Sequence, residues 1–198
     1  MNNEIARIII VLLGGIWGIY QAYSSHFESS FFDFFELILS VIIISPIWIW
    51  SFYEYSVAKN RSQKRQNGIA ILVGGILLSI TITIYSFTNY QFNKPTLVKV
   101  LYDGGYNGIA IDFKTDGTFI TNDSAMFGSI YSYGEYSIEN NKIVLIGGEL
   151  SSFFHSNRLL ITEFAVGIGD SRKRVYQVDD TETKIPNSTE FKLTVDNR

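Results

Sequence analysis

Residues 69–87 read IAILVGGILLSITITIYSF, and no charged residue occurs between Arg65 and Lys94. At about 1.5 Å per helical residue, a stretch of this length covers roughly the 30 Å of a bilayer's hydrocarbon core. The stretch also separates two unlike halves of the chain. The long apolar runs lie before it, and most of the acidic residues lie after it. The sequence therefore predicts a membrane-spanning helix here, with a water-soluble domain following it.

The chain before this stretch is also apolar. We expect a transmembrane region over residues 1–90, with spans at about 5–23, 34–53 and 69–88. A signal peptide is the competing interpretation of the first segment. A retained helix is preferred because Glu4 stands in its lead and no small-x-small cleavage site precedes polar sequence. Pro46 lies inside the second segment and predicts a kink there.

Small residues four apart recur in two of these segments. Gly14 and Gly18 form one such step, and Gly75 and Ser79 form another. Steps of this kind let a second helix approach closely, so these four residues are candidates for self-association through the membrane. The alternative is that the glycines merely tolerate burial in lipid.

A basic cluster lies between the second and third segments. It comprises Lys59, Arg61, Lys64 and Arg65. Positive charge next to a span is typical of a cytoplasmic loop. This rule places the end of the third span, and the domain that follows it, on the opposite, periplasmic side.

Composition excludes several classes of function. The formal net charge of −3 provides no basic surface for DNA or RNA. With no cysteine, the chain has no disulfide, no thiol catalyst and no thiolate metal site. The two histidines, His26 and His155, lack the spacing of metal ligands. We expect no catalytic residues, no metal and no cofactor, and therefore a protein that is not an enzyme.

After a linker at residues 91–95, the hydrophobic period changes to two over residues 96–198. Ile109, Ile111 and Phe113 alternate with Ala110, Asp112 and Lys114, which predicts one face in a core and the other in water. Turn residues that accept positive φ recur at Asp103-Gly104-Gly105, Asp116-Gly117, Asn140-Asn141 and Gly147-Gly148. The predicted strands are 96–102, 108–114, 118–122, 129–138, 142–146, 158–164, 173–178 and 190–195. The expected fold class is therefore membrane α plus all-β, with an antiparallel eight-stranded up-and-down barrel or tight sandwich.

Aromatic and basic residues on these strands are candidates for ligand contact. Tyrosine rings can stack on bases, and Arg or Lys can meet phosphates. Tyr is also a good strand former, and a basic residue on an outward strand face is ordinary. The candidates are Tyr133, Tyr136, Arg158, Arg174 and Tyr176.

Two segments of the soluble part carry a family resemblance. Residues 112–120 read DFKTDGTFI, and residues 134–145 read GEYSIENNKIVL. Their rhythm resembles that of bacterial lipocalin-like barrels. Together with the N-terminal membrane segments, the chain resembles the STING-like membrane effectors of CBASS antiphage defence, and the related effector of the Panoptes defence system.

The resemblance implies a cytoplasmic barrel that binds a cyclic di- or trinucleotide. The ligand would alter the assembly of the transmembrane helices, which would then breach the bacterial inner membrane. The family usually has two spans, whereas three are predicted here, and the positive-inside rule places the barrel in the periplasm. The alternative is an exported, lipocalin-like binding or scaffolding domain anchored in the inner membrane.

Overall fold

The computed structural model describes the backbone of residues 3–30, 32–148, 151–167 and 170–198. Side chains are described at these positions except at 3, 4, 34, 37, 40, 41, 43, 44, 164–167 and 170–172. The chain divides into two compact units, residues 1–91 and residues 92–198.

Helices make up almost all of the first unit. They are α1 (Asn3–Phe27), α2 (Asp33–Val57) and α3 (Arg61–Phe92), and the short strand β1 (Glu28–Ser30) lies between the first two. The predicted spans 5–23, 34–53 and 69–88 each fall inside one helix, although the predicted span 34–53 includes side chains outside the described set. Each helix is longer than its predicted span. α2 continues through Pro46, and α3 ends three residues before Pro95, which cannot continue a helix.

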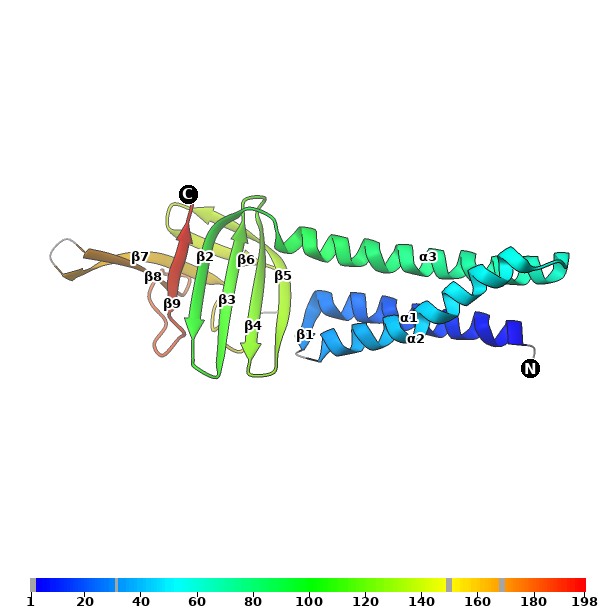
Figure 1. Ribbon diagram of the computed structural model, residues 1–198. Helices are drawn as coiled ribbons and strands as arrows, with labels where there is room; N and C mark the ends of the chain where they lie inside the picture. Colours follow the sequence, from blue (N-terminus) through cyan, green and yellow to red (C-terminus); the bar gives the residue numbers. More distant parts are fainter. Residues whose placement is uncertain (1–2, 31, 149–150, 168–169) are drawn as a thin grey trace. The chain divides into compact units, whose positions relative to one another are not determined.

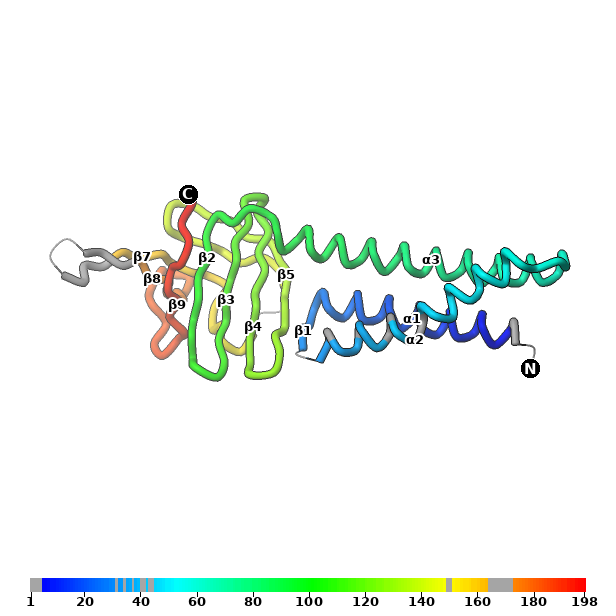
Figure 2. The backbone as a smooth tube through the Cα atoms, in the orientation of Figure 1, coloured from blue at the N-terminus to red at the C-terminus, as the bar shows by residue number. Residues whose placement is uncertain are grey.

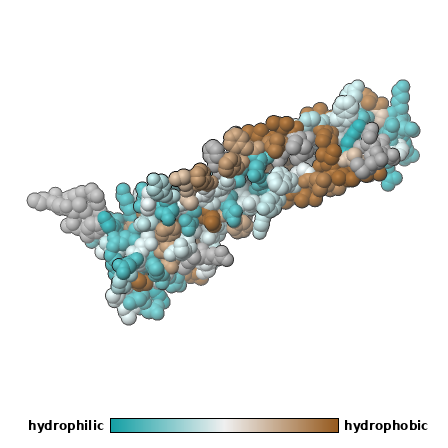
Figure 3. All heavy atoms as spheres, turned by 90° about the horizontal axis from the view of Figure 1, so that it is seen from below, coloured by the Kyte–Doolittle hydropathy of each residue, from teal (hydrophilic) through white to brown (hydrophobic). Residues whose placement is uncertain are grey.

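Two of these helices have the dimensions of a membrane span. Among the described residues, Ile5–Phe27 and Arg61–Phe92 are long and apolar enough to cross a bilayer. On the face drawn in Figure 3, hydrophobic residues gather over the helical unit and hydrophilic residues over the strand unit.

Two glycines allow α3 to pack closely on the other helices. A Cβ on Gly15 of α1 would overlap the Leu77 side chain of α3. A Cβ on Gly74 of α3 would lie 2.5 Å from Nε1 of Trp48 in α2. Because real Cβ atoms do not approach that closely, only glycine permits these two contacts.

The second unit is a closed, antiparallel up-and-down barrel (Figures 1 and 2). Each strand pairs with the next along the chain, and the last pairs with the first. The eight predicted strands are confirmed with small shifts at their ends, and the barrel, not the sandwich, is the architecture. The strands are β2 (Thr96–Asp103), β3 (Asn107–Lys114), β4 (Thr118–Ala125), β5 (Gly128–Glu139), β6 (Lys142–Ile146), β7 (Arg158–Gly167), β8 (Asp170–Gln177) and β9 (Phe191–Asp196).

The turns between these strands use the residues that the sequence singles out. Gly105 and Gly117 both have φ of 86°, Gly147 has 69°, and Asn140 has 55°. Glycine and asparagine adopt this left-handed region at least cost, so the turns end the strands where predicted.

Side chains fill the barrel interior. Ile109, Ile111 and Phe113 are fully buried, as their alternation predicts. Other buried core residues are Val98, Val100, Phe119, Tyr136, Ile143, Leu145, Leu159, Ile161, Val175 and Phe191.

The loop before β7 adds a cover to this core. Phe154 stacks on Phe191 with ring centroids 5.8 Å apart. The buried side chain of Gln177 accepts a hydrogen bond from the main-chain N–H of His155 at 2.6 Å and donates one to the carbonyl of Phe153 at 2.7 Å. This buried amide fixes the loop to the strands, because its polar atoms have no water to bind.

The alternation predicts that Lys114 faces water, and this prediction is wrong. Its side chain is only 2% exposed. Its Nζ donates to the carbonyl oxygens of Phe92 (2.8 Å) and Lys94 (3.1 Å) and to the carboxylate of Asp112 (2.8 Å). The entering segment supplies two of the three acceptors and Asp112 of β3 supplies the third, so all three donors of the buried ammonium are satisfied. This is how a buried charge is tolerated.

A second ion pair ties the same entering segment to the β3–β4 turn. Lys94 Nζ lies 2.7 Å from the carboxylate of Asp116, which also accepts from the Thr118 hydroxyl at 2.6 Å. The hydrogen bond from Lys94, followed by that from Thr118, lowers the pKa of Asp116 to about 2. Residues 92–95 are therefore part of the folded barrel unit and not a free linker.

We predict that this entering segment is required for the stability of the barrel. A fragment that starts at residue 90 should unfold cooperatively in urea. A fragment that starts at residue 96 lacks two acceptors of Lys114 and the partner of Asp116, and should be about 2 kcal/mol less stable. Urea titration followed by far-UV circular dichroism measures the difference, and equal midpoints and slopes would contradict the role of this segment.

Candidate functional site

The carboxylate of Glu54 joins all three helices at one end of the first unit. Both terminal nitrogens of Arg7 in α1 donate to it, with Nη2 2.8 Å from Oε1. Trp50 of α2 donates to the same Oε1 at 2.7 Å. Asn67 of α3, which is buried, also interacts with the carboxylate. A bidentate Arg–carboxylate pair is among the stronger polar contacts in proteins, so we call this set the Glu54 junction.

A second set of polar contacts lies further along the same helices. Gln21 of α1 donates through Nε2 to the carboxylate of Glu36 in α2. The hydroxyl of Thr88 in α3 lies 3.3 Å from Nδ1 of His26 in α1. These contacts again connect α1 to both other helices.

The helices are apolar between these two polar layers. No Asp, Glu, Lys or Arg occurs at residues 8–27, 37–53 or 66–93. The residues that contribute to the two layers lie 14 to 21 positions apart along each helix, or roughly 21–32 Å at 1.5 Å per residue. Large apolar side chains between them are exposed, among them Leu13 (64%), Ile42 (60%) and Leu72 (63%). An uncharged, outwardly apolar slab of this thickness matches the hydrocarbon core of a bilayer.

The four predicted self-association residues have unlike surroundings within this unit. Gly14 is half-buried, and a Cβ on Gly18 would touch Thr81 at an ordinary 3.7 Å. A Cβ on Gly75 would meet nothing within 4 Å, and Ser79 is exposed with its hydroxyl bonded to the Gly75 carbonyl at 2.8 Å. The tight contacts inside the unit therefore use the neighbouring Gly15 and Gly74. Self-association through the predicted residues stays a prediction.

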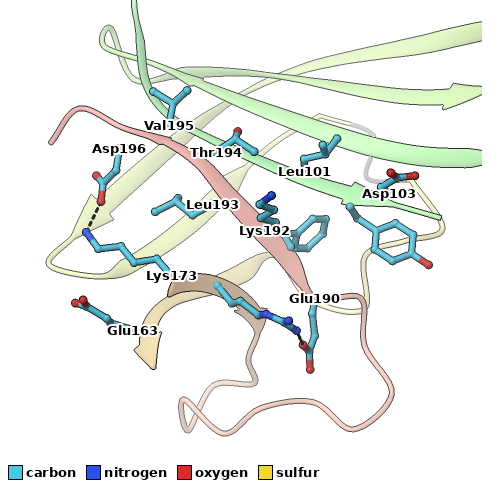
Figure 4. Close-up of a pocket in the computed structure, with 13 residues that line it drawn as sticks. Leu101, Asp103, Glu163, Lys173, Glu190, Lys192, Leu193, Thr194, Val195 and Asp196 are labelled. Atoms are coloured by element: carbon cyan, nitrogen blue, oxygen red, sulfur yellow. Dashed lines mark hydrogen bonds and ion pairs between the residues drawn. The ribbon is translucent and has the colours of Figure 1, made fainter. Parts of the chain in front are cut away.

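On the barrel, a groove of about 820 Å³ opens beside the shortest strand pairing (Figure 4). β8 and β9 share only two register pairs, Arg174 with Lys192 and Val175 with Phe191. Beyond these two pairs, β8 continues to pair with β7 as a hairpin, and β9 pairs with β2. The groove lies where these two pairs of strands separate. Its lining includes apolar residues of β2 and β9, namely Leu101, Tyr102, Leu193 and Val195.

Charged side chains of both signs surround this groove. Its lining contains the cations Lys173, Arg174 and Lys192 and the acids Asp103, Glu163, Glu190 and Asp196. Lys173 Nζ bridges the groove to Asp196 at 2.7 Å. Because Lys173 and Arg174 are already paired with carboxylates, an anionic ligand has to replace those carboxylates as partners of the two cations.

One carboxylate, Glu190, connects two of the predicted ligand residues. It accepts from Arg174 Nη1 at 3.0 Å and from Lys184 Nζ. Lys184 Nζ also lies 4.3 Å above the ring of Tyr176. The hydrogen bond from Lys184, the largest cause, lowers the pKa of Glu190 from its ordinary value. The structure therefore brings Arg174 and Tyr176 into one polar network on the outer face of β8.

The other three predicted ligand residues lie elsewhere. Arg158 opens β7 and pairs through Nε with Asp180 at 2.8 Å. Tyr136 of β5 is in the core, where its hydroxyl donates to the Lys114 carbonyl at 2.6 Å and burial raises its pKa. Tyr133, also on β5, is half-buried, and burial followed by the neighbouring Tyr131 raises its pKa.

Sequence reasoning missed the members of the network that lie outside the regular strands. Lys184 comes from the β8–β9 loop, and Glu190 immediately precedes β9. No local pattern marks either of them, since their roles arise only when the loop returns to β8. Lys192 also lines the groove without having been predicted from the sequence. It is exposed and, within the described part of the chain, has no ion-pair partner.

The fold is thus that of a protein with long apolar helices followed by a small, closed, antiparallel β-barrel. In comparisons with protein-family models, with curated proteins and with solved structures, the chain matched none.

Proposed function

We propose that this protein is a membrane effector of antiphage defence in the bacterial inner membrane. Its barrel binds a cyclic di- or trinucleotide, and the bound state controls self-association of its transmembrane helices, which disrupts the membrane. The observation that carries the proposal is the helical unit, where an exposed apolar slab is bounded by two polar layers. The resemblance of residues 112–145 to lipocalin-like barrels of such effectors supplies the ligand class.

The membrane part of the proposal follows from free energy. Large exposed apolar side chains in water are costly, at roughly 25 cal/mol per Å² of apolar surface. In a bilayer the same side chains face lipid, and the charged Glu54 junction lies at the slab edge, where water and headgroups solvate it. Lipid contact therefore explains the distribution of exposed residues over α1 and α3.

The ligand part rests on the surface of β8. Arg174 presents a guanidinium suited to bidentate phosphate contact, and Tyr176 presents a ring suited to a base. In this network, Glu190 accepts a hydrogen bond from Arg174, and Lys184 Nζ lies over the ring of Tyr176. A nucleotide phosphate would replace Glu190 as the partner of both cations and so release the ring face.

A second candidate function is an exported binding or scaffolding domain anchored in the inner membrane. The exposed basic residues at the α2–α3 connection favour it, because positive charge is typical of the cytoplasmic side. A single crossing by α3 then places the chain after Phe92 in the periplasm, away from cytoplasmic nucleotides.

Nucleotide binding is tested on the full chain in detergent micelles. Across a panel of cyclic di- and trinucleotides, we expect one to raise the melting temperature, since a ligand at 100 times its Kd stabilises by about 2.7 kcal/mol. Arg174→Ala should weaken binding by about tenfold or more, through loss of a charge-assisted phosphate contact. Lys142→Ala is the matched control, because Lys142 lies outside the groove and pairs with the exposed Glu182 at 2.6 Å. No shift with any member of the panel would exclude the nucleotide role.

Adjacent glycines test helix assembly. Gly75→Leu adds a side chain on an open face, so the monomer should fold normally while oligomers and toxicity on expression disappear. Gly74→Leu meets the Trp48 indole and should instead lower the stability of the helical unit by about 1–3 kcal/mol. Crosslinking in membranes and growth assays separate the two effects. Unchanged oligomers in Gly75→Leu would place the interface on another face.

A reporter fused after Arg198 distinguishes the two candidate functions. For the nucleotide sensor, a fluorescent reporter should be active and alkaline phosphatase inactive, because the barrel must face the cytoplasm. Active alkaline phosphatase would rule out the sensor and support the exported domain. Fusions after Lys59, in the α2–α3 connection, provide the control for the opposite face.

A further inference from the structure

The connection between α2 and α3 carries a cluster of exposed cations. Lys59, Arg61, Lys64 and Arg65 are all exposed. Among the described residues, none of the four has an ion-pair partner, and the ring of Tyr55 lies 5.8 Å from Lys64 Nζ. No Asp or Glu occurs between Glu54 and Asp103, and Glu54 is occupied by the Arg7 guanidinium. We call these four residues the basic patch.

Helix stability does not account for the basic patch. Arg61, Lys64 and Arg65 stand at positions i, i+3 and i+4 in the first turns of α3, so their side chains share one face. Like charges at this spacing repel one another, and positive charge at a helix N-terminus opposes the helix dipole. The first turn contains no acidic residue to offset either effect. The arrangement is unfavourable in isolation and becomes favourable when an anion lies over it.

The position of the patch identifies the source of that anion. Arg65 is two residues before Asn67, and Tyr55 is next to Glu54, so the patch adjoins the Glu54 junction at the edge of the apolar slab. In a bilayer this edge lies at the level of the lipid headgroups. Phosphates of anionic lipids supply negative charge there, each basic residue near such a surface being worth about 1 kcal/mol.

We propose that the basic patch is a binding surface for the headgroups of anionic phospholipids. This inference rests on the membrane embedding in the proposed function, but it is independent of the nucleotide and of self-association. Headgroup phosphates over Arg61, Lys64 and Arg65 neutralise the repulsion at the start of α3. They thereby stabilise the helix turns that hold Asn67 in the Glu54 junction, so that anionic lipid strengthens the link between the three helices.

The test measures the thermal unfolding temperature of the full chain in two kinds of nanodisc. One kind is pure phosphatidylcholine, and the other contains about 30 mol% phosphatidylglycerol. Each is measured at about 50 mM and at about 500 mM NaCl. We expect a higher unfolding temperature with phosphatidylglycerol at low salt and a smaller difference at high salt, because salt screens exposed charges. Equal unfolding temperatures in the two lipids at low salt would overturn the proposal. Failure of the chain to enter either nanodisc would instead contradict the membrane embedding.

Matched variants locate the effect. The triple variant Arg61→Gln, Lys64→Gln, Arg65→Gln should enter nanodiscs and lose most of the phosphatidylglycerol-dependent shift. The control Lys142→Gln, Arg158→Gln, Lys192→Gln makes the same change of charge on the barrel and should keep the shift. A shift that survives in the first variant, or that disappears equally in both, would show that the patch is not the binding surface.

Soluble phosphate separates lipid from free anion. Inorganic phosphate and glycerol phosphate, added to phosphatidylcholine nanodiscs at the concentration of the phosphatidylglycerol headgroups, should not raise the unfolding temperature. Unlike lipid headgroups, these anions are not held at the slab edge. A shift equal to that of phosphatidylglycerol would identify a free-anion site and overturn the lipid assignment.

Discussion

The barrel depends on one buried ammonium group, that of Lys114. Three acceptors surround it, and two of them are main-chain carbonyls of the segment that leads from the helices into β2. The carbonyl of the same residue accepts the hydroxyl of Tyr136 from across the core. Removal of any of these partners leaves a buried polar group unpaired, which costs more than the net contribution of a satisfied hydrogen bond. Lys114 therefore holds together the segment that enters the barrel, β3 and β5.

The residues that carry the family resemblance are explained by packing in this core. Phe113, Phe119 and Tyr136 form an aromatic group, with ring centroids 6.2 Å apart for the first pair and 4.9 Å for Phe113 and Tyr136. Gly134 lies under the Phe119 ring, since a Cβ there would come within 2.6 Å of it. Gly117 has the positive φ that the β3–β4 turn requires. The motif therefore describes how consecutive hairpins of a small barrel pack against one another.

In the helical unit, apolar packing and polar contacts are separated by position. Gly15 and Gly74 admit large side chains between the helices, whereas Glu54, Gln21 and Thr88 make their polar contacts at the slab edges. Hydrogen bonds at the edges fix which helix ends meet, because an unpaired polar group near hydrocarbon is costly. This arrangement leaves the face of Gly75 open, since a Cβ there would meet nothing within 4 Å.

The amino-acid sequence by itself determined the elements. Charge-free apolar runs marked the helices, and the period of two with glycine and asparagine turns marked all eight barrel strands, since both signals arise from neighbours along the chain. The sequence also predicted that Arg174 lies on a late strand of the barrel, but it did not predict which residues Arg174 contacts. Only the tertiary structure decided that Lys114 is buried, that Glu54 joins three helices, and that Glu190 links Arg174 to Lys184. Each of these features depends on segments that meet only after folding. In the folded chain, the groups around a buried or shared charge decide which partner it pairs with.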